Sequence, residues 1–134
     1  MYPILKKQNL NDQVVLMEIQ APLVAKKALP GQFIIFRIDE EGERVPLTIA
    51  GYDRVKGSIT LIFQKVGYTT SKLGMMSVGD SLLDFVGPLG EPTHTDGIHR
   101  AAVIGGGLGV AIAYPQAKAP VSYTHLTLPT MAVV

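Results

Sequence analysis

Arg44 begins a short segment whose side chains could hold a phosphate group and a flat ring together. A guanidinium binds phosphate oxygens through paired, charge-assisted hydrogen bonds. Pro46 keeps the backbone extended, Leu47 offers an apolar face, Thr48 offers a hydroxyl, and Ile49 completes the segment. This set suits a ligand that combines a pyrophosphate with a planar ring. The alternative is a strand with one exposed arginine and an edge proline.

A second segment, Gly67 to Thr70, lies between a strand-like run and a predicted helix. The first N–H groups of a helix have no partner within it, so they can bind an anion. The hydroxyls of Thr69 and Thr70 add polar groups at the same turn. The alternative for Gly67 and its neighbours is an ordinary capped helix.

A third segment, Gly87-Pro88-Leu89-Gly90, combines two glycines with a proline. These residues fix a loop that a bulky cofactor or a second domain can approach closely, and the candidate contact is Gly87. The alternative is a surface turn.

A fourth segment is rich in glycine and follows the apolar run 100–104. A helix-like run, residues 110–119, comes directly after it. A buried strand, a glycine-rich turn and a helix form the first unit of a doubly wound nucleotide-binding sheet. One such unit cannot make that sheet, so we expect a truncated second domain. The candidate ligand-binding residues are Gly105, Gly106, Gly107 and Gly109.

The elements that position these segments are mostly strands joined by short turns. Strands are predicted at Tyr2 to Leu10, Val14 to Ile19, Gln32 to Ile38, Arg44 to Tyr52, Ser58 to Val66 and Ser81 to Val86. A loop, with or without one helical turn, is predicted at 21–29, and a further loop at 87–95. The first credible helix is Thr69 to Met76. This order favours an antiparallel sandwich or barrel.

Composition excludes several classes of protein. The chain has 134 residues, 47% of them hydrophobic, a net charge of +1 and no cysteine. No basic run indicates nucleic acid, and disulfides, thiolate metal sites and cysteine nucleophiles are excluded. The acidic turn 39–43 is expected to be solvated, so we predict no metal site. The first residues show no signal-peptide pattern. The run 101–114 is too short and too rich in glycine to span a bilayer. We therefore expect a cytoplasmic protein.

In this order, the first three segments resemble the flavin-binding barrel of the ferredoxin–NADP reductase superfamily. The chain looks most like the flavoprotein subunit of NADH-dependent ferredoxin:NADP oxidoreductases, also called the sulfide dehydrogenase beta subunit. It is also similar to the electron-transfer subunit of dihydroorotate dehydrogenase. The resemblance covers Met1 to about Ala119.

The resemblance implies a mainly β fold, an antiparallel Greek-key FAD-binding barrel with one short helix, over residues 1–97. A truncated first βα unit of a Rossmann-like NAD(P)-binding domain would follow over residues 98–119. The turn at Gly67 would hold the FAD pyrophosphate, and the loop at Gly87 would lie between the domains near the flavin. The cluster at Gly105 would bind NAD(P)H.

The superfamily pattern is arginine, any residue, tyrosine, then serine or threonine. Alignment on Thr48 places Leu47 where the aromatic residue stacks on the flavin, and Val45 rather than Arg44 in the arginine position. We therefore expect Pro46, Leu47 and Thr48 to line the ring more closely than Arg44 binds phosphate.

The implied function is that of an oxidoreductase subunit. NAD(P)H would reduce FAD, and electrons would pass singly to an iron–sulfur centre of a larger partner subunit or to ferredoxin. No side chain needs to act as an acid or base, so no catalytic residue is predicted. The family's 2Fe-2S cluster is expected only in the missing C-terminal part, and the fragment is expected to be inactive alone.

Two alternatives remain open. A dihydroorotate dehydrogenase electron-transfer subunit would share this chemistry with a different partner, although a second arginine directly before Pro46 would favour it and Val45 is there. A non-enzymatic β-barrel binding module is the other alternative. The balanced charge gives no basic face of the kind that RNA-binding barrels usually show.

The end of the chain, Pro120 to Thr130, resembles the translation of a sequencing-library transposon end. We therefore expect residues 120–134 to be a non-native tail in which His125 carries no function. The alternative is a genuine β-rich tail.

Overall fold

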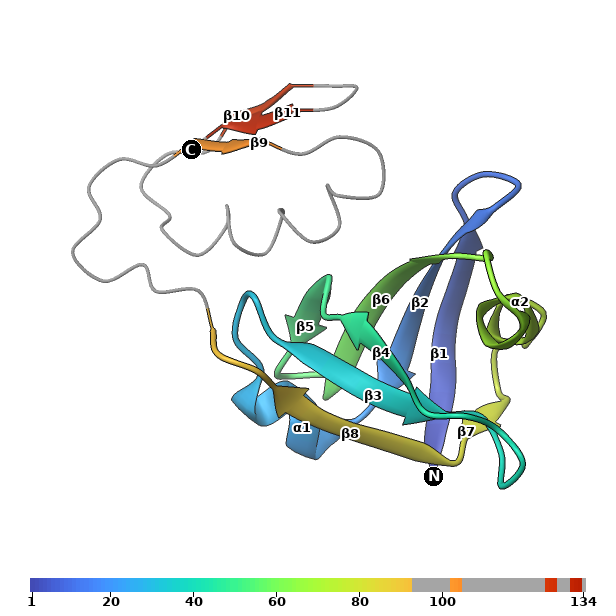
Figure 1. The fold of residues 1–134 in the computed structure, drawn as a ribbon. Coiled ribbons are helices and arrows are strands. Elements are labelled where there is room, and N and C mark those ends of the chain that lie inside the picture. The colour runs from blue at the N-terminus through green and yellow to red at the C-terminus, as the bar shows by residue number, and fades with distance from the viewer. Residues whose placement is uncertain (93–101, 105–124, 128–130, 134) are drawn as a thin grey trace.

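The computed structural model describes residues 1–92, 102–104, 125–127 and 131–133. These residues form three antiparallel sheets (Figure 1). The first sheet has the order β5-β6-β2-β1-β7. Its strands are β1 (Tyr2–Asn9), β2 (Val14–Gln20), β5 (Gly51–Asp53), β6 (Ser58–Gln64) and β7 (Ser81–Leu82). The second sheet has the order β4-β3-β8, with β3 (Phe33–Arg37), β4 (Val45–Thr48) and β8 (Asp84–Leu89).

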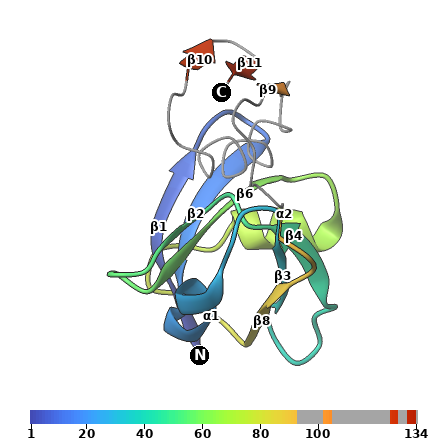
Figure 2. The same cartoon turned by 90° about the vertical axis from the view of Figure 1, so that its left-hand side faces the viewer.

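Burial alternates along these strands, so each has one face turned into the core. In β2, Val15, Met17 and Ile19 are fully buried while their neighbours are not. The core cluster draws on both sheets, which face each other across it (Figure 2). Phe36 of β3 and Phe63 of β6 are its largest fully buried side chains.

Two strand runs that the sequence predicts as continuous each divide between the two sheets. The run 44–52 becomes β4 and β5, and the break falls where the N–H of Ile49 donates to Gln32 and that of Ala50 donates to Thr60. The run 81–86 becomes β7, paired with β1, and the start of β8, paired with β3. Chains that change sheet at a corner close two sheets around one core.

The predicted loop after Val86 is wrong at its start, because β8 continues through Leu89. The Gly87–Pro88 peptide bond is cis. A Cβ atom on Gly87 would lie 2.7 Å from Cγ2 of Ile34, so the glycine lets β8 pack closely against β3. Because β8 is an edge strand of its sheet, a proline is tolerated there.

The barrel has two short helices among the described residues rather than one: α1 (Pro22–Lys27) and α2 (Tyr68–Gly74). Helix α2 confirms the helix predicted at 69–76. Helix α1 lies in the predicted loop 21–29 and has no side-chain N-cap. At the other end of the helix, Arg54 of the β5–β6 turn donates hydrogen bonds to the carbonyls of Ala25, Lys26 and Ala28.

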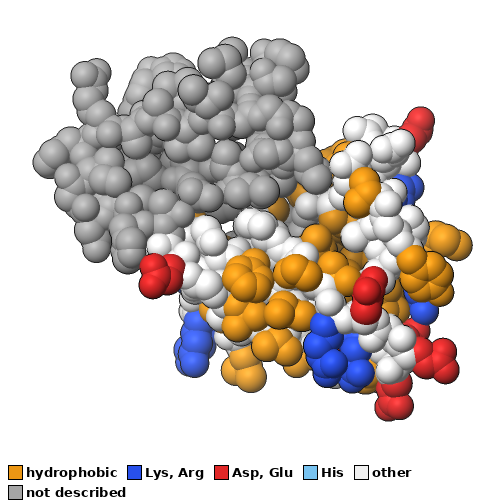
Figure 3. Space-filling model, viewed as in Figure 1, with side chains coloured by type: hydrophobic (Ala, Val, Ile, Leu, Met, Phe, Trp, Pro, Cys, Tyr) orange, Lys and Arg blue, Asp and Glu red, His pale blue; other side chains and the backbone are white. Residues whose placement is uncertain are grey.

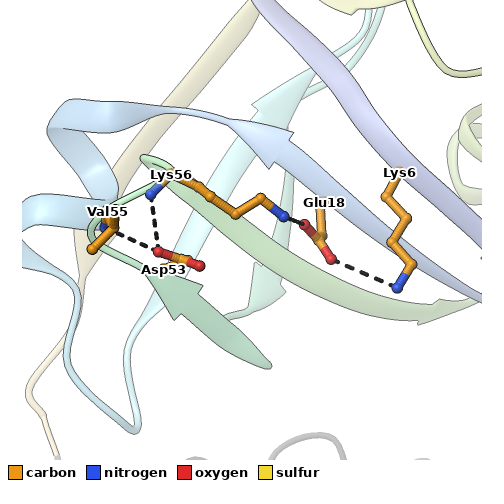
Figure 4. A network of polar contacts seen from close by, with 5 residues as sticks. All are labelled: Lys6, Glu18, Asp53, Val55 and Lys56. Carbon is orange, nitrogen blue, oxygen red and sulfur yellow. Dashed lines mark hydrogen bonds and ion pairs between the residues drawn. The ribbon is translucent and has the colours of Figure 1, made fainter.

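The outer surface of the first sheet carries a polar network that supports the β5–β6 turn (Figure 4). Glu18 of β2 lies 3.1 Å from Nζ of Lys56 and 3.9 Å from Nζ of Lys6 on β1. The carboxylate of Asp53 accepts hydrogen bonds of 2.9 Å from the backbone N–H groups of Val55 and Lys56. The network stabilises the β5–β6 hairpin.

The third sheet has the order β10-β11-β9, with β9 (Ala102–Ile104), β10 (His125–Thr127) and β11 (Met131–Val133). Strand β9 agrees with the apolar strand predicted at 100–104. Two of its strands lie in the segment expected to be a non-native tail. The boundary at 97 and 98, the glycine cluster 105–109 and the run 110–119 lie outside the described residues, so the domain division stays a prediction.

Candidate functional site

An open pocket of about 370 Å³ lies at the second sheet. It is lined by Gly31, Phe33, Pro46, Leu47 and Thr48. Three of these are the residues that the sequence assigns to a flat ring. The volume falls within the range of small-molecule sites, which are mostly apolar with a few polar groups.

The register of β3 and β4 decides which side chains face outward. Phe33 pairs with Thr48 and Ile35 with Pro46, whereas the buried Ile34 pairs with Leu47. Leu47 borders the pocket but packs against the core cluster. The outer face near the pocket therefore presents Pro46, Thr48 and an aromatic residue, Phe33.

Hydrophobic side chains gather over the second sheet in the space-filling view (Figure 3). Ile35 also pairs with Val86 of β8, and Val86 is exposed. Phe33 belongs to this outer face and was not predicted as a site residue. The signal that could have found it is the alternation of β3, because Ile34 and Phe36 fill the core and so turn Phe33 and Ile35 outward.

Ile49 was predicted to bind the cofactor, and the structure places it elsewhere. Its side chain is fully buried in the core. Its N–H donates to the carbonyl of Gln32 at 3.0 Å, at the corner where the chain leaves β4. Ile49 therefore holds the corner beside the pocket, and its side chain is not exposed to a ligand.

Gln32 joins three segments around the pocket. Its side chain is buried, and its Oε1 accepts from the N–H of Leu29 at 3.0 Å. Its Nε2 donates to the carbonyl of Gly90 at 2.9 Å, and its own carbonyl accepts from Ile49. Because both ends of the amide are used, the α1–β3 loop and the end of β8 hold fixed positions next to Phe33.

Arg44 is not among the residues that line the pocket. Its Nη2 is 3.5 Å from Oδ2 of Asp84, and the same oxygen accepts from Nε of Arg37 at 2.8 Å. Arg44 directly precedes β4 and lies two residues before Pro46, which lines the pocket. Its guanidinium is well exposed and pairs with a carboxylate.

The turn at Gly67 precedes α2, as the sequence predicts. Oγ1 of Thr70 accepts from the N–H of Gly67 at 3.0 Å and from that of Val66 at 3.2 Å, which caps the helix. The hydroxyl of Thr69 donates to Oε1 of Glu43 at 2.6 Å. Both hydroxyls are thus used in hydrogen bonds within the protein.

Gly67 itself has an extended backbone, with φ of −131° and ψ of 179°, which any residue adopts. A Cβ atom there would have only Oγ1 of Thr70 nearby, at 3.9 Å. The barrel therefore does not need a glycine at this position, and the space in front of the turn is open.

A second pocket, of about 340 Å³, lies between the β3–β4 loop and α2. Nζ of Lys72 lies 2.7 Å from Oδ2 of Asp39. This hydrogen bond lowers the pKa of Asp39 and raises that of Lys72. Within the described residues no group of three acidic or histidine side chains could hold a metal ion.

Known proteins share this barrel, although no family model matches the chain. It is 47% identical over 127 residues to an uncharacterised protein in the adh 3′ region of Clostridium beijerinckii, covering 88% of this chain and 42% of that protein. It is 41% identical over 116 residues to a homolog of the dihydroorotate dehydrogenase B (NAD(+)) electron transfer subunit from Thermotoga maritima, covering 87% and 41%.

Solved structures agree. The structure of an NADH-dependent reduced ferredoxin-NADP oxidoreductase matches with a TM-score of 0.86 and 40% identity, covering 90% of this chain and 44% of that chain. A ferredoxin reductase of carbazole 1,9a-dioxygenase matches with a TM-score of 0.77 at 22% identity, which supports the fold alone. The chain spans less than half the length of these relatives.

The antiparallel barrel is that of a ferredoxin reductase-type flavoprotein. These matches confirm the resemblance to the ferredoxin–NADP reductase superfamily on which the sequence interpretation rests. No helix among the described residues is long and apolar enough to cross a membrane.

Proposed function

We propose that this chain is the FAD-binding part of an oxidoreductase subunit that passes electrons between NAD(P)H and an iron–sulfur partner or ferredoxin. The observation that carries the proposal is the pocket beside β4, in a barrel that is 40% identical to an NADH-dependent ferredoxin-NADP oxidoreductase. Because the chain spans less than half of that relative, the activity of the whole protein is part of the proposal.

The pocket residues fit the ring of a flavin. Phe33 and Pro46 supply apolar surface for its faces, and the hydroxyl of Thr48 can bond to its polar edge. Leu47 supports the strand from the core side. None of these groups carries a charge, which suits a neutral ring system.

The turn at Gly67 is the proposed site of the pyrophosphate. The first amides of α2, at Tyr68, Thr69 and Thr70, have no partners within the helix. The capping role of the Thr70 hydroxyl leaves those amides as the donors. Since Gly67 presents no side chain, an anion can approach the backbone closely.

Other parts of the proposal rest on the sequence. Gly87 would lie near the flavin, although its packing against Ile34 already requires a glycine. The pyrophosphate of NAD(P)H would bind at the glycine cluster that starts at Gly105. A 2Fe-2S cluster would belong to a part of the protein beyond this chain.

FAD, when bound, would accept a hydride and pass on electrons one at a time. The residues of this chain would bind and orient it: the residues that line the pocket would fix the plane of the ring, and the α2 turn would bind the phosphates. No side chain is assigned a proton transfer. The partner would be a larger subunit or ferredoxin, the compartment would be the cytoplasm, and the fragment alone would be inactive.

A second candidate is an electron-transfer subunit of dihydroorotate dehydrogenase. The names of several relatives favour it, with identities of 31–37% to subunits so named. Val45 stands where a second arginine would have supported this assignment. Both candidates use the same cofactor site and differ in the partner.

Titration of the 134-residue chain with FAD and with FMN tests the proposal. We expect FAD to bind more tightly than FMN, since two phosphates can reach the α2 turn while the ring lies at the second sheet. Quenching of flavin fluorescence reports the binding. Equal weak binding of both, or none, would contradict the proposal and favour a binding module without a flavin.

A further inference from the structure

Phe33 is the first residue of β3, the central strand of the second sheet, and lines the pocket. It pairs with Thr48 of β4 on one side and with Leu89 of β8 on the other. Its side chain is half-buried and lines the pocket. An aromatic ring in this position can contact a second ring that enters the pocket.

Gly90 fixes the ring of Phe33 from the side of β8. A Cβ atom on Gly90 would lie 2.9 Å from Cε1 and 3.1 Å from Cδ1 of Phe33, so the ring fills the space that a side chain would need. Gly90 has a φ of 80°, and its carbonyl accepts the hydrogen bond from Gln32. The chain is therefore held in a conformation that glycine favours, directly against the ring.

We infer that Phe33 is the aromatic wall against which the flavin ring lies, and that Gly90 positions it. This inference rests on the proposed function and adds a residue that neither the motif nor the alignment identified. Aromatic rings gain by offset stacking on one another, and an aliphatic side chain of similar size lacks that gain. The outer face of β4 offers Pro46 and Thr48, neither of which is aromatic, so Phe33 supplies the stacking partner.

Replacement of Phe33 tests the wall directly. We expect Phe33→Leu to weaken FAD binding about 5- to 10-fold and to make the bound flavin more fluorescent. Phe33→Tyr should restore both values to within about 2-fold of the original protein. Val86→Ala, an apolar truncation on the same outer face but outside the pocket lining, is the matched control and should change neither.

Riboflavin carries the flavin ring without the phosphates, so its binding reports the contacts of the ring alone. If Phe33 contacts the flavin ring, riboflavin binding by Phe33→Leu should weaken by the same factor as FAD binding. A loss for FAD alone would mean that Phe33 contacts the adenine end, which would overturn the inference.

Gly90→Ala tests the positioning role without changing the wall itself. We expect about 3- to 5-fold weaker FAD binding, because the added methyl group displaces the ring. Gly79→Ala is the control for backbone strain, since Gly79 has a φ of 98° and a Cβ atom there would meet nothing within 4 Å. The double variant with Phe33→Leu and Gly90→Ala should bind FAD as weakly as Phe33→Leu alone, because the two residues act through one contact.

The outcomes separate this inference from the proposed function. If the original chain binds FAD and Phe33→Leu binds it equally well, the inference is overturned and the proposed function stands. If the original chain binds no flavin, both are overturned. Should Phe33→Leu fail to fold by circular dichroism, unchanged FAD affinity in Gly90→Ala would overturn the inference.

Discussion

The guanidinium of Arg54, in the neighbouring β5–β6 turn, donates a hydrogen bond of 2.9 Å to the carbonyl oxygen of Ala25 at the end of helix α1. The same side chain also bonds to the carbonyls of Lys26 and Ala28 and lies over the ring of Tyr52 at 4.7 Å. One residue thus binds the last carbonyls of α1, and these bonds add to the helix's own C-cap bond from the N–H of Ala28 to the carbonyl of Val24.

Removal of this cap should destabilise the barrel. We expect Arg54→Met to lower the free energy of unfolding by about 1–3 kcal/mol, because carbonyls at the end of α1 lose a charged donor. Arg54→Lys should recover only part of the loss, since an ammonium group cannot reproduce the planar fork. Thermal unfolding followed by circular dichroism measures both. Lys56→Met, which removes an exposed ion pair, is the control, and an equal loss there would contradict the assignment.

Helix α1 is one element that the sequence analysis did not predict as a helix. The strands β1, β2, β3 and β6 and helix α2 follow from local alternation and turn residues, so they were predicted within a few positions. Pro22 at the start of helix α1 is a local signal, but the contacts of its C-terminal carbonyls with Arg54 come from a distant segment and leave no local pattern. The division of 44–52 into β4 and β5 depends on whether the partner is β3 or β6, which is a property of the closed barrel.

The candidate site was predicted only in part, because some of its residues come together only through the pairing of strands in the barrel. Pro46 and Thr48 were identified from their own segment, and the structure places both at the pocket. Phe33 was missed because it lies on another strand and meets Thr48 only through the register. Ile49 was included by its position in the motif, although the corner turns it into the core.

The amide of Gln32 should matter for stability and for the pocket. Gln32→Leu leaves the N–H of Leu29 and the carbonyl of Gly90 without their partner, and we expect a loss of about 1–3 kcal/mol in the free energy of unfolding. Urea unfolding measures it. Gln64→Leu removes an exposed side-chain bond to Gln13 and should cost less than about 0.5 kcal/mol. Losses of similar size would show that the buried amide has no special role.

The pair of Asp39 and Lys72 predicts a dependence of stability on pH. The hydrogen bond from Lys72 lowers the pKa of Asp39 below its ordinary 3.8, so its stabilising contribution is present above that value and is lost as pH falls through the lowered pKa. The partner carboxylate raises the pKa of Lys72 above 10.5, so that contribution is complete below this value and is lost as pH rises through the raised pKa.

Asp39→Asn tests this dependence. The melting temperature of the original chain should exceed that of the variant between about pH 4 and pH 10, and the difference should shrink toward both extremes. High salt should also reduce it, because both side chains are partly exposed. A difference that stays constant down to about pH 2 would contradict the assigned pair.

The two phosphate candidates can be compared by substitution. Gly67→Val should fold normally, because its backbone is extended and the space beside it is open, yet it should weaken FAD binding about tenfold or more by blocking approach to the α2 amides. Arg44→Ala should weaken binding by no more than about 5-fold, as its guanidinium is exposed and paired with Asp84. Dissociation constants at two salt concentrations decide between them. A larger, salt-dependent loss in Arg44→Ala would mean that Arg44 binds the phosphate directly.

The central claim, that FAD lies with its ring at the second sheet and its phosphates at the α2 turn, is tested most directly by NMR titration of the 134-residue chain with FAD. We predict that the amide signals of Gly31, Phe33 and Thr48 shift together with those of Thr69 and Thr70. Riboflavin should shift only the first group. Shifts confined to the outer surface of the first sheet, around Lys6 and Glu18, or no shifts at all, would contradict it.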